Sequence, residues 1–309
     1  MKNINTSTAY FRDDFVDFKD ATLSIASAPV LYGLSVYTVI PVFWDAKRHK
    51  LYIFRLKDYF RRLQNSAKIM AFDDFLKDWD YEEFEEKIIK LLKGNDVQCD
   101  ALVRVSIFVD DVLKGVRMQG LKHSVSAFVY PMTDIIPKEG AKLMVSSWQR
   151  TPDNAIPARA KINGNYANAA LMKHEAVSNG FDDAIALDGH GHVTESTIAN
   201  LFMVRDNVLV TPHTSSDILE GITRDSVLKI AKASGIQTEE RYIDRSELYI
   251  ADEIFLCGSS MSIIPVESVD RRPIGNSVPG SYTLELQKGY KLTFFQEAKL
   301  FSSWLTLVV

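Results

Sequence analysis

Hydrophobic residues between positions 21 and 54 follow a strand-like pattern. Runs rich in Val, Ile, Tyr and Phe are interrupted by short polar segments, and the polar run DAKRHK separates the last two runs. A short polar turn between two β-rich runs is typical of a hairpin. Strands are therefore expected over 21–26, 30–44 and 51–56.

The spacing becomes helical after this hairpin. Apolar residues recur every three to four positions over 57–70 and again over 84–95, which predicts two amphipathic helices. Gly94 favours the end of the second helix, because glycine accepts the left-handed backbone found at helix C-termini. Strand-like runs return over 101–111 and 123–132, so the N-terminal part of the chain is expected to be an α+β unit.

Residues 132–139 contain two turn-formers and no hydrophobic periodicity, which is typical of a linker. We therefore predict an N-terminal domain over 1–131 and a C-terminal domain over 140–309. In the second domain the strands are joined mostly by hairpins, which disfavours the doubly wound parallel fold of dinucleotide-binding proteins. Its expected strands cover 142–150, 182–188, 192–206, 208–212 and parts of 241–270 around a short helix, and its expected longer helices cover 165–180, 221–235 and 282–300.

The composition is that of an ordinary globular protein with a full-sized core. Of the 309 residues, 46% are hydrophobic and 25% are charged, and the net charge is −4. Without a basic face, a general affinity for nucleic acid is not expected. The N-terminus has no hydrophobic signal core, and no apolar run approaches the roughly 18 residues that span a bilayer. A cytoplasmic location is therefore expected.

Metal and disulfide chemistry find little support in the sequence. Only two cysteines occur, far apart, and they have no Cys/His spacing of a zinc site. His190 and His192 flank a glycine in a polar segment, for which a solvated turn is the simpler interpretation. We expect no metal.

Lys161, in the segment KINGNY, is the first candidate for chemistry. It precedes a Gly-Asn turn and a helix that is expected to begin near Asn165. A lysine at this place is an ordinary exposed side chain or, if it points into a pocket, a nucleophile. The local pattern leaves both interpretations open.

Two further segments could bind an anion. In LEGITRD a helix is expected to begin near Gly221 or Ile222, and its first amide groups lack helical partners at the positive end of the dipole. Gly221 allows a close backbone approach and the Thr223 hydroxyl adds a donor, which suits a phosphate. In CGSSM, the residues after Gly258 could form a nest of N–H donors. A capped helix start and a polar turn are the simpler interpretations of each segment alone.

Glu195 lies between two polar residues in an otherwise apolar, β-rich stretch. If it faces the core it must be paired, because an unpaired buried carboxylate is costly; the alternative is a solvated strand face. A lysine nucleophile, anion-binding turns and a buried acid together suggest pyridoxal phosphate. This cofactor needs a lysine for its aldehyde, N–H donors for its phosphate and an acid for its ring nitrogen. The common nucleotide, zincin and serine-hydrolase motifs are not present.

The order of these segments resembles that of fold-type IV pyridoxal-phosphate enzymes. The sequence is most similar to branched-chain amino-acid aminotransferases, and the similarity runs over nearly the whole chain. It implies an α+β fold with a small N-terminal α/β domain, a larger C-terminal domain with a barrel-like β core, the cofactor between them, and at least a homodimer. The segments that carry the resemblance are YGLSVY, RLQNSAKI, VSSWQR, KINGNYANAAL, ES...NLF, LEGITRD, YIADEIFLCGS and GSS...IIPV.

The resemblance implies roles around pyridoxal 5′-phosphate. Lys161 would form the Schiff base with the cofactor and, once displaced by the substrate amine, act as the base that moves the proton. Glu195 would pair with the ring nitrogen, and Tyr166 would hydrogen-bond the ring 3′-oxygen. The phosphate would be bound by Arg62, Ile222, Thr223 and Ser259, an arginine fork being well suited to phosphate.

The resemblance also implies a substrate site. Arg104 would receive the side-chain carboxylate of glutamate or 2-oxoglutarate, although a structural ion pair is the alternative for a strand arginine. Tyr32 matches an active-site tyrosine of the family. The amides of Ser260 and Met261 would meet the α-carboxylate of the substrate.

Several positions depart from the family pattern. Where the family commonly has FEGIR, this chain has YTVIP, so Val39 and Pro41 replace a glycine and an arginine. Leu102 replaces a tyrosine that helps to bind the α-carboxylate, and ESTIAN replaces the glycine-rich EGAGEN. These changes concern the substrate side rather than the cofactor side, and they put specificity for branched-chain substrates in question.

The expected activity is a ping-pong transamination between an aliphatic L-amino acid, such as a branched-chain one, and a 2-oxo acid such as 2-oxoglutarate. A lyase resembling aminodeoxychorismate lyase is an alternative, because Lys161 and Glu195 would serve it equally. A D-amino-acid or amine transaminase is a second alternative. A non-catalytic protein of the same fold is the third, and the joint presence of Lys161, Glu195, Tyr166 and Arg62 argues against it.

Overall fold

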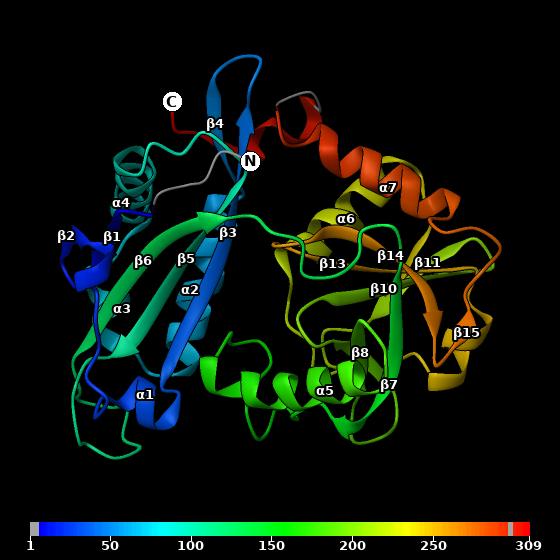
Figure 1. The fold of residues 1–309 in the computed structure, drawn as a ribbon, viewed down its shortest axis with the longest axis horizontal. Helices are drawn as coiled ribbons and strands as arrows, with labels where there is room; N and C mark the ends of the chain where they lie inside the picture. The colour runs from blue at the N-terminus through cyan, green and yellow to red at the C-terminus, as the bar shows by residue number, and fades with distance from the viewer. Residues whose placement is uncertain (1–5, 296–298) are drawn as a thin grey trace. The chain divides into compact units, whose positions relative to one another are not determined.

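The computed structural model describes residues 6–295 and 299–309, and the chain divides into two compact units (Figure 1). Unit 1 comprises Met1–Met132, Ala160–Gly164 and Thr293–Val309, and unit 2 comprises Thr133–Arg159 and Asn165–Leu292. The predicted domain 140–309 contains 160–164 and 293–309, so the packed units differ from the predicted domains at these two segments.

Unit 1 is built on one antiparallel sheet in the order β16-β4-β3-β5-β6-β1-β2. The hairpin predicted around DAKRHK is confirmed as β3 and β4, which pair in antiparallel register. The strands are β1 (Thr8–Phe11), β2 (Asp14–Asp17), β3 (Ser35–Asp45), β4 (Lys50–Phe54), β5 (Ala101–Val109), β6 (His123–Pro131) and β16 (Leu305–Leu307).

The two long helices of unit 1 pack on the sheet with their apolar faces. Both predicted amphipathic helices are present, as α2 and α4, and each buries its hydrophobic stripe. The short helix α3 was not predicted, since six residues give too little periodicity. The helices are α1 (Ala28–Tyr32), α2 (Leu56–Ile69), α3 (Asp73–Asp78) and α4 (Tyr81–Gly94), with a 3₁₀ turn at Phe18–Asp20.

The strands expected over 21–26 and at the start of 30–44 are wrong. Residues 21–26 form neither strand nor helix, and α1 occupies Ala28–Tyr32. Pro29 lies in the first turn of α1, where its missing N–H costs nothing, and Gly33 ends the helix with a left-handed φ of 68°. These two local features override the apolar pattern.

Unit 2 contains a closed six-stranded barrel, which confirms the predicted barrel-like core. Strands β10, β13, β14, β7, β8 and β9 pair in sequence, and the pairing of β9 with β10 at Glu195 and Asn200 closes the ring. Strands β11, β12 and β15 extend this sheet outside the barrel. The strands are β7 (Ala141–Gln149), β8 (Asp183–Leu187), β9 (Val193–Ser196), β10 (Asn200–Arg205), β11 (Val208–Pro212), β12 (Thr238–Arg241), β13 (Glu253–Gly258), β14 (Ser262–Val269) and β15 (Arg272–Pro273).

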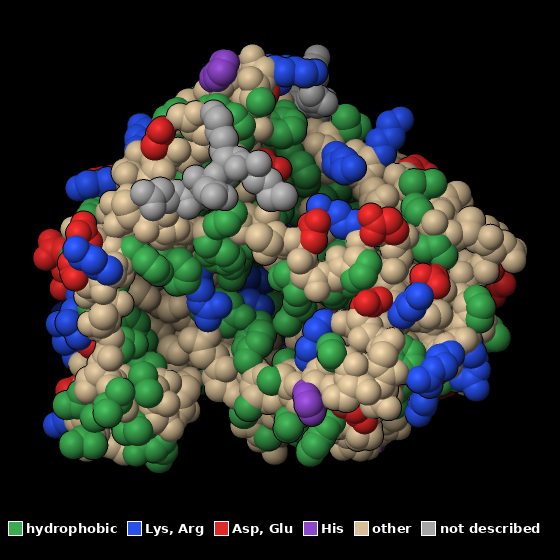
Figure 2. Space-filling view, in the orientation of Figure 1, with side chains coloured by type: hydrophobic (Ala, Val, Ile, Leu, Met, Phe, Trp, Pro, Cys, Tyr) green, Lys and Arg blue, Asp and Glu red, His purple; other side chains and the backbone are tan. Residues whose placement is uncertain are grey.

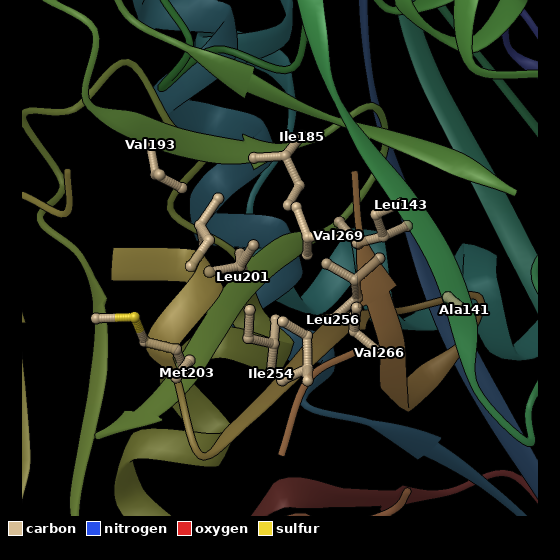
Figure 3. Close-up of a cluster of buried hydrophobic side chains, with 14 of the residues drawn as sticks. Ala141, Leu143, Ile185, Val193, Leu201, Met203, Ile254, Leu256, Val266 and Val269 are labelled. Atoms are coloured by element: carbon tan, nitrogen blue, oxygen red, sulfur yellow. The ribbon is translucent and has the colours of Figure 1, made fainter. Parts of the chain in front are cut away.

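Aliphatic side chains fill the barrel (Figure 3). Leu143, Ile185, Leu201 and Leu256 are each fully buried and come from four different barrel strands. Alternation along each strand turns such residues inward, so the barrel is a packed core rather than a channel. The barrel therefore gives its rim residues a rigid support.

Three longer helices belong to unit 2: α5 (Tyr166–Ser178), α6 (Ile222–Ala233) and α7 (Ser281–Leu292). Helices α5 and α6 match the predictions. The helix predicted over 282–300 is too long: α7 ends at Leu292, a 3₁₀ turn follows at Lys299–Trp304, and residues 296–298 lie outside the described part of the chain. Within the described residues, no helix is long and apolar enough to cross a membrane.

Candidate active site

Lys161 is anchored by its main chain to unit 1. Its carbonyl oxygen accepts a hydrogen bond from the Tyr37 amide of β3 at 2.9 Å, and its own amide donates to Ser66 Oγ of α2 at 3.2 Å. The side chain is half-buried, and Nζ lies 5.0 Å from the centroid of the Tyr37 ring. Lys161 is therefore not the exposed lysine of the simpler interpretation.

Two glycines allow the turn after Lys161 to pack tightly. Gly33 has a φ of 68°, and a Cβ atom on it would lie 2.7 Å from Cα of Gly164. No side chain fits such a backbone contact, so this approach requires glycine. The turn of KINGNY and the end of α1 are thereby fixed against each other within unit 1.

Arg62 comes from the buried face of α2. It is 9% exposed, and its Nη2 donates to Thr38 Oγ1 on β3 at 3.1 Å. Its guanidinium carbon lies 5.2 Å from the centroid of the Tyr59 ring, one turn earlier on the same helix. Adjacent residues of β3, Tyr37 and Thr38, thus contact the candidate nucleophile and the candidate phosphate ligand.

Arg104 lies on the central strand β5 with its guanidinium over the Tyr37 ring. Its Cζ is 3.6 Å from the ring centroid, and Nη2 donates to Asn163 Oδ1 at 2.7 Å. Within the described residues no Asp or Glu forms an ion pair with it. A structural ion pair therefore does not explain this half-buried arginine.

Glu195 is buried on β9, in the rim of the unit 2 barrel, and is 5% exposed. Arg150 Nη2 donates to its Oε1 at 2.5 Å, and Asn200 Nδ2 and the Leu219 amide donate to its Oε2 at 2.9 and 3.2 Å. Hydrogen bonds from a buried guanidinium, an amide side chain and a main-chain N–H all favour the ionised carboxylate. Glu195 is thus a paired core residue and not part of a solvated strand face.

Asn200 joins Glu195 to the start of α6. It donates to the Leu219 carbonyl oxygen at 2.9 Å as well as to Glu195. A Cβ atom on Gly221 would lie only 2.0 Å from Asn200 Oδ1, so a side chain at position 221 would force the buried Asn200 amide to move. The acid and the helix N-terminus are therefore held at a fixed separation within unit 2.

The start of α6 fits a phosphate. Gly221 is the N-cap residue and, having no side chain, adds no capping hydrogen bond of its own. Thr223 is 2% exposed, and its Oγ1 is buried without a hydrogen-bond partner in the described part of the chain. A buried hydroxyl without a partner is costly, and a phosphate oxygen would satisfy it. This result supports the phosphate interpretation over Thr223 as a cap.

The other predicted cofactor and substrate residues also have defined places. Tyr166 is the first residue of α5 and packs against a small apolar cluster of that helix. Ser259, Ser260 and Met261 form the turn between β13 and β14. Met261 buries its side chain in the barrel core, and its amide donates to the Gly258 carbonyl oxygen at 3.2 Å.

Tyr32 is the last residue of α1 and is 44% exposed in the single chain. Cys257 on β13 lies opposite Asn200, but it is fully buried, and burial raises the pKa of its thiol to about 12. It is therefore not a nucleophile near neutral pH. Within the described residues no group of three or more His, Cys, Asp or Glu side chains could hold a metal ion.

Three residues around the site had no predicted role: Arg150, Asn163 and Asn200. Arg150 and Asn200 lie in the segments VSSWQR and ES...NLF, which resemble the family. That resemblance does not show which side chain each residue contacts. The pairing of Arg150 with Glu195 spans 45 residues of sequence, and local patterns contain no information on such contacts.

The residues present suit pyridoxal phosphate. When bound, this cofactor serves as an electron sink that makes the bond to the substrate Cα hydrogen labile. Lys161 can accept and return a proton at Nζ, and Glu195 can accept a hydrogen bond from a protonated ring nitrogen. The start of α6 and Arg62 offer N–H donors of the kind a phosphate needs.

Comparisons with known proteins agree with this chemistry. A model of the amino-transferase class IV family matches residues 35–269. The chain is 32% identical to a probable branched-chain-amino-acid aminotransferase of Aquifex aeolicus, covering 100% of this chain and 99% of the relative. It is 35% identical to the branched-chain-amino-acid aminotransferase of Escherichia coli K12, covering 97% and 96%.

Solved structures have the same fold. A branched-chain aminotransferase of Thermoproteus uzoniensis with norvaline superposes with a TM-score of 0.92 at 31% identity, covering 99% of this chain and 100% of that one. The branched-chain amino acid aminotransferase of Thermobaculum terrenum in its PLP-form, the holo-form, gives 0.91 at 29% identity, covering 99% of both chains. The predicted fold type and cofactor are confirmed, and the chain belongs to the class IV aminotransferases, enzymes that work with pyridoxal phosphate.

Proposed function

We propose that this aminotransferase moves an amino group between an aliphatic L-amino acid, such as a branched-chain one, and a dicarboxylic 2-oxo acid such as 2-oxoglutarate. Arg104 carries this proposal. It is a half-buried cation without an acidic partner in the described chain, and it lies over the same Tyr37 ring as Lys161 Nζ. Its cross-strand neighbours are the apolar residues Val39 and Phe128. A lone cation among apolar groups suits a distal carboxylate in one half-reaction and leaves room for an alkyl chain in the other.

We further propose roles for individual residues toward pyridoxal phosphate. Lys161 is the catalytic base, and Glu195 is the partner of the ring nitrogen. Pyridoxal phosphate needs a lysine, an acid and a phosphate site, and the described residues offer each of these. The remaining proposed cofactor ligands are Arg62, Tyr166, Ile222, Thr223 and Ser259, and the remaining proposed substrate residues are Tyr32, Ser260 and Met261.

The visible spectrum of the purified holoenzyme tests the donor. L-leucine, L-glutamate and D-alanine are added separately without an acceptor, and loss of the absorption band of lysine-bound cofactor is followed. We expect L-leucine and L-glutamate to bleach the band, and 2-oxoglutarate to restore it after L-leucine. Bleaching by D-alanine alone would mean a D-amino-acid transaminase. Release of pyruvate from aminodeoxychorismate, with no response to the three amino acids, would mean a lyase.

We also propose a homodimer that uses an apolar surface of unit 1. Ile25, Val30, Leu113 and Val116 are 85%, 55%, 78% and 72% exposed. The Leu113 amide donates to the Ala26 carbonyl oxygen at 3.2 Å, so the two segments form one surface, which appears as a green area over α1 in Figure 2. Monomeric proteins rarely expose such a continuous patch, and a second copy would cover it.

Sedimentation of the native protein and of Leu113→Asp tests the dimer. We expect the native chain to sediment as a dimer and the variant to shift toward the monomer, because a carboxylate would be buried without a partner. A native monomer at micromolar concentration would contradict the proposal. A cytoplasmic location stays a prediction of the sequence.

A further inference from the structure

Asn163 connects the nucleophile segment with Arg104. Its side-chain Oδ1 accepts the hydrogen bond from Arg104 Nη2 at 2.7 Å, and its Nδ2 donates to Ser35 Oγ on β3. Asn163 is half-buried and lies two residues after Lys161. No role for this residue was expected from the sequence.

The main chain fixes the position of Asn163. Ile162 is buried and forms an antiparallel bridge with Val36, and the neighbouring Tyr37 amide donates to the carbonyl oxygen of Lys161. The segment thus extends the unit 1 sheet at β3. Because Ser35 and Tyr37 belong to the same strand, β3 supports both Asn163 and the aromatic ring under Arg104.

Arg104 has most of its hydrogen-bonding capacity left over. A guanidinium carries five N–H donors, and the bond to Asn163 is the one hydrogen bond that Arg104 donates within the described residues. The Tyr37 face at 3.6 Å restrains the plane of the group without consuming a donor. The guanidinium is therefore oriented but not satisfied.

The side chain that holds Arg104, here called its anchor, is a neutral amide, and this matters for the charge of the site. A carboxylate at position 163 would orient Arg104 equally well, but it would also neutralise its charge. The neutral amide oxygen of Asn163 holds the guanidinium and leaves its full positive charge for a ligand. An anchor of this kind is suited to an arginine whose partner is an incoming anion.

We propose that Asn163 is a positioning residue that selects dicarboxylic over monocarboxylic substrates by orienting Arg104. This inference rests on the proposed function, in which Arg104 receives the distal carboxylate. It adds that the selection between the two substrate classes depends on a neutral hydrogen-bond acceptor, the Asn163 side chain, two residues after Lys161. A loss of this acceptor weakens binding of the distal carboxylate and leaves the binding of monocarboxylates unchanged.

Titration calorimetry of the holoenzyme with glutarate and pentanoate tests this proposal. The two acids have the same number of carbon atoms and differ by one carboxylate, and neither can react. For Asn163→Ala we expect the dissociation constant of glutarate to rise about tenfold, the usual effect of losing a hydrogen bond to a charged group, with pentanoate unchanged. For Asn163→Asp we expect a rise of about a hundredfold for glutarate alone, because the new carboxylate competes for Arg104.

Steady-state kinetics provide a second readout. In both variants the Michaelis constant for 2-oxoglutarate should rise, whereas kcat and the Michaelis constant for 2-oxopentanoate stay near the native values. The absorption band of lysine-bound cofactor should also be unchanged, which shows that Lys161 still works. Asn179→Ala serves as the matched control, because its side chain caps α5 at the Glu175 carbonyl oxygen and touches none of these groups.

The outcomes separate this inference from the function on which it rests. If Arg104→Gln weakens the binding of glutarate and Asn163→Ala does not, the positioning role of Asn163 is wrong and the proposed function stands. If Arg104→Gln leaves glutarate binding intact, the dicarboxylate role of Arg104 fails first. Equal losses for glutarate and pentanoate in Asn163→Ala would also overturn the inference, since they would indicate a general distortion of the site.

Discussion

The two units support their candidate catalytic groups in different ways. In unit 1, Lys161 is fixed through its main chain, with hydrogen bonds to Tyr37 and Ser66, and its Nζ lies over the Tyr37 ring. In unit 2, Glu195 is fixed through its side chain, with three donors on its two carboxylate oxygens. Lys161 thus has a fixed backbone and a flexible side chain of four methylenes. Glu195, in contrast, has a fixed carboxylate.

This difference matches what each group must do. A residue that accepts and returns a proton has to change position during the reaction, so a fixed backbone with a flexible stem serves it. A residue that stabilises charge works best if it is oriented before the ligand arrives, because no reorganisation is then needed. The antiparallel sheet of unit 1 provides the first arrangement, and the rim of the closed barrel provides the second.

The largest expected effect comes from removing the Lys161 side chain. Lys161→Ala should lower turnover by at least about 10³-fold, because the general base is lost. The absorption band of lysine-bound cofactor should disappear, while circular dichroism stays unchanged because the main-chain contacts of position 161 remain. Lys142→Ala is the control, since that lysine is 55% exposed with one ion pair at 3.7 Å. Full activity of the Lys161 variant would contradict its assignment.

Removing the charge of the Glu195 carboxylate should have the next largest effect. Glu195→Gln keeps the shape of the side chain but removes the anion, and we expect a loss of about 10²–10³-fold in kcat with the cofactor still bound. Single-turnover spectroscopy would measure the rate, and absorbance of the cofactor would measure its occupancy. An unchanged rate would mean that Glu195 has a structural role only.

A substitution of Arg150 tests whether Glu195 depends on the guanidinium that holds its carboxylate, here called the clamp. Arg150→Met leaves a buried carboxylate without its cation, which typically costs about 3–5 kcal/mol in unfolding free energy. Urea unfolding of the cofactor-free protein would show this loss. Arg159→Met is the matched control: its ion pairs with Asp153 and Glu220 are exposed, and it should lose less than about 1 kcal/mol. Equal losses in the two variants would contradict the clamp.

Glu247 is a second clamped carboxylate in unit 2, but it has no proposed part in catalysis. Hydrogen bonds from Arg241, outweighing partial burial, lower the pKa of Glu247 from 4.5 to about 2, with a further contribution from Arg205. A lowered pKa stabilises the fold above the unfolded value of 4.5, and this stability is lost as the pH falls toward 2.

Glu247→Gln should therefore destabilise the protein at pH 7 by at most about 3 kcal/mol. The difference from the native chain should shrink below pH 4.5 and vanish near pH 2, as measured by urea unfolding at several pH values. Turnover at pH 7 should stay native. A variant that loses turnover as Glu195→Gln does would show that rigidity of unit 2, and not the charge at position 195, controls the rate.

The smallest expected effect concerns the phosphate site. Thr223→Val removes a buried hydroxyl without a partner in the described chain, so the cofactor-free protein should keep its stability. The dissociation constant of pyridoxal phosphate should rise about tenfold. Thr211→Val is the inverse control, because its hydroxyl already donates to the Leu201 carbonyl oxygen at 2.8 Å. That variant should lose about 1 kcal/mol of stability and no affinity.

The sequence by itself determined the elements with strong periodicity and the family. Helices α2, α4, α5 and α6 and the hairpin of β3 and β4 follow from local apolar spacing, which acts over a few residues. The family resemblance added the order of motifs around Lys161 and Glu195. The predictions for 21–26 and for the start of 30–44 were wrong for the same local reason, since Pro29 and Gly33 decide the backbone of α1 and not the apolar pattern.

Only the tertiary structure decided which residues are partners. Arg150 reaches Glu195 across 45 residues, and Arg104 reaches Asn163 across 59. The burial of Glu195 depends on the pairing of β9 with β10 that closes the barrel. Local patterns report the spacing of side chains along one element, but burial, clamping and the lack of a counter-ion for Arg104 among the described residues arise from contacts between elements. These long-range contacts set the charge and the freedom of each group, and so they decide its chemistry.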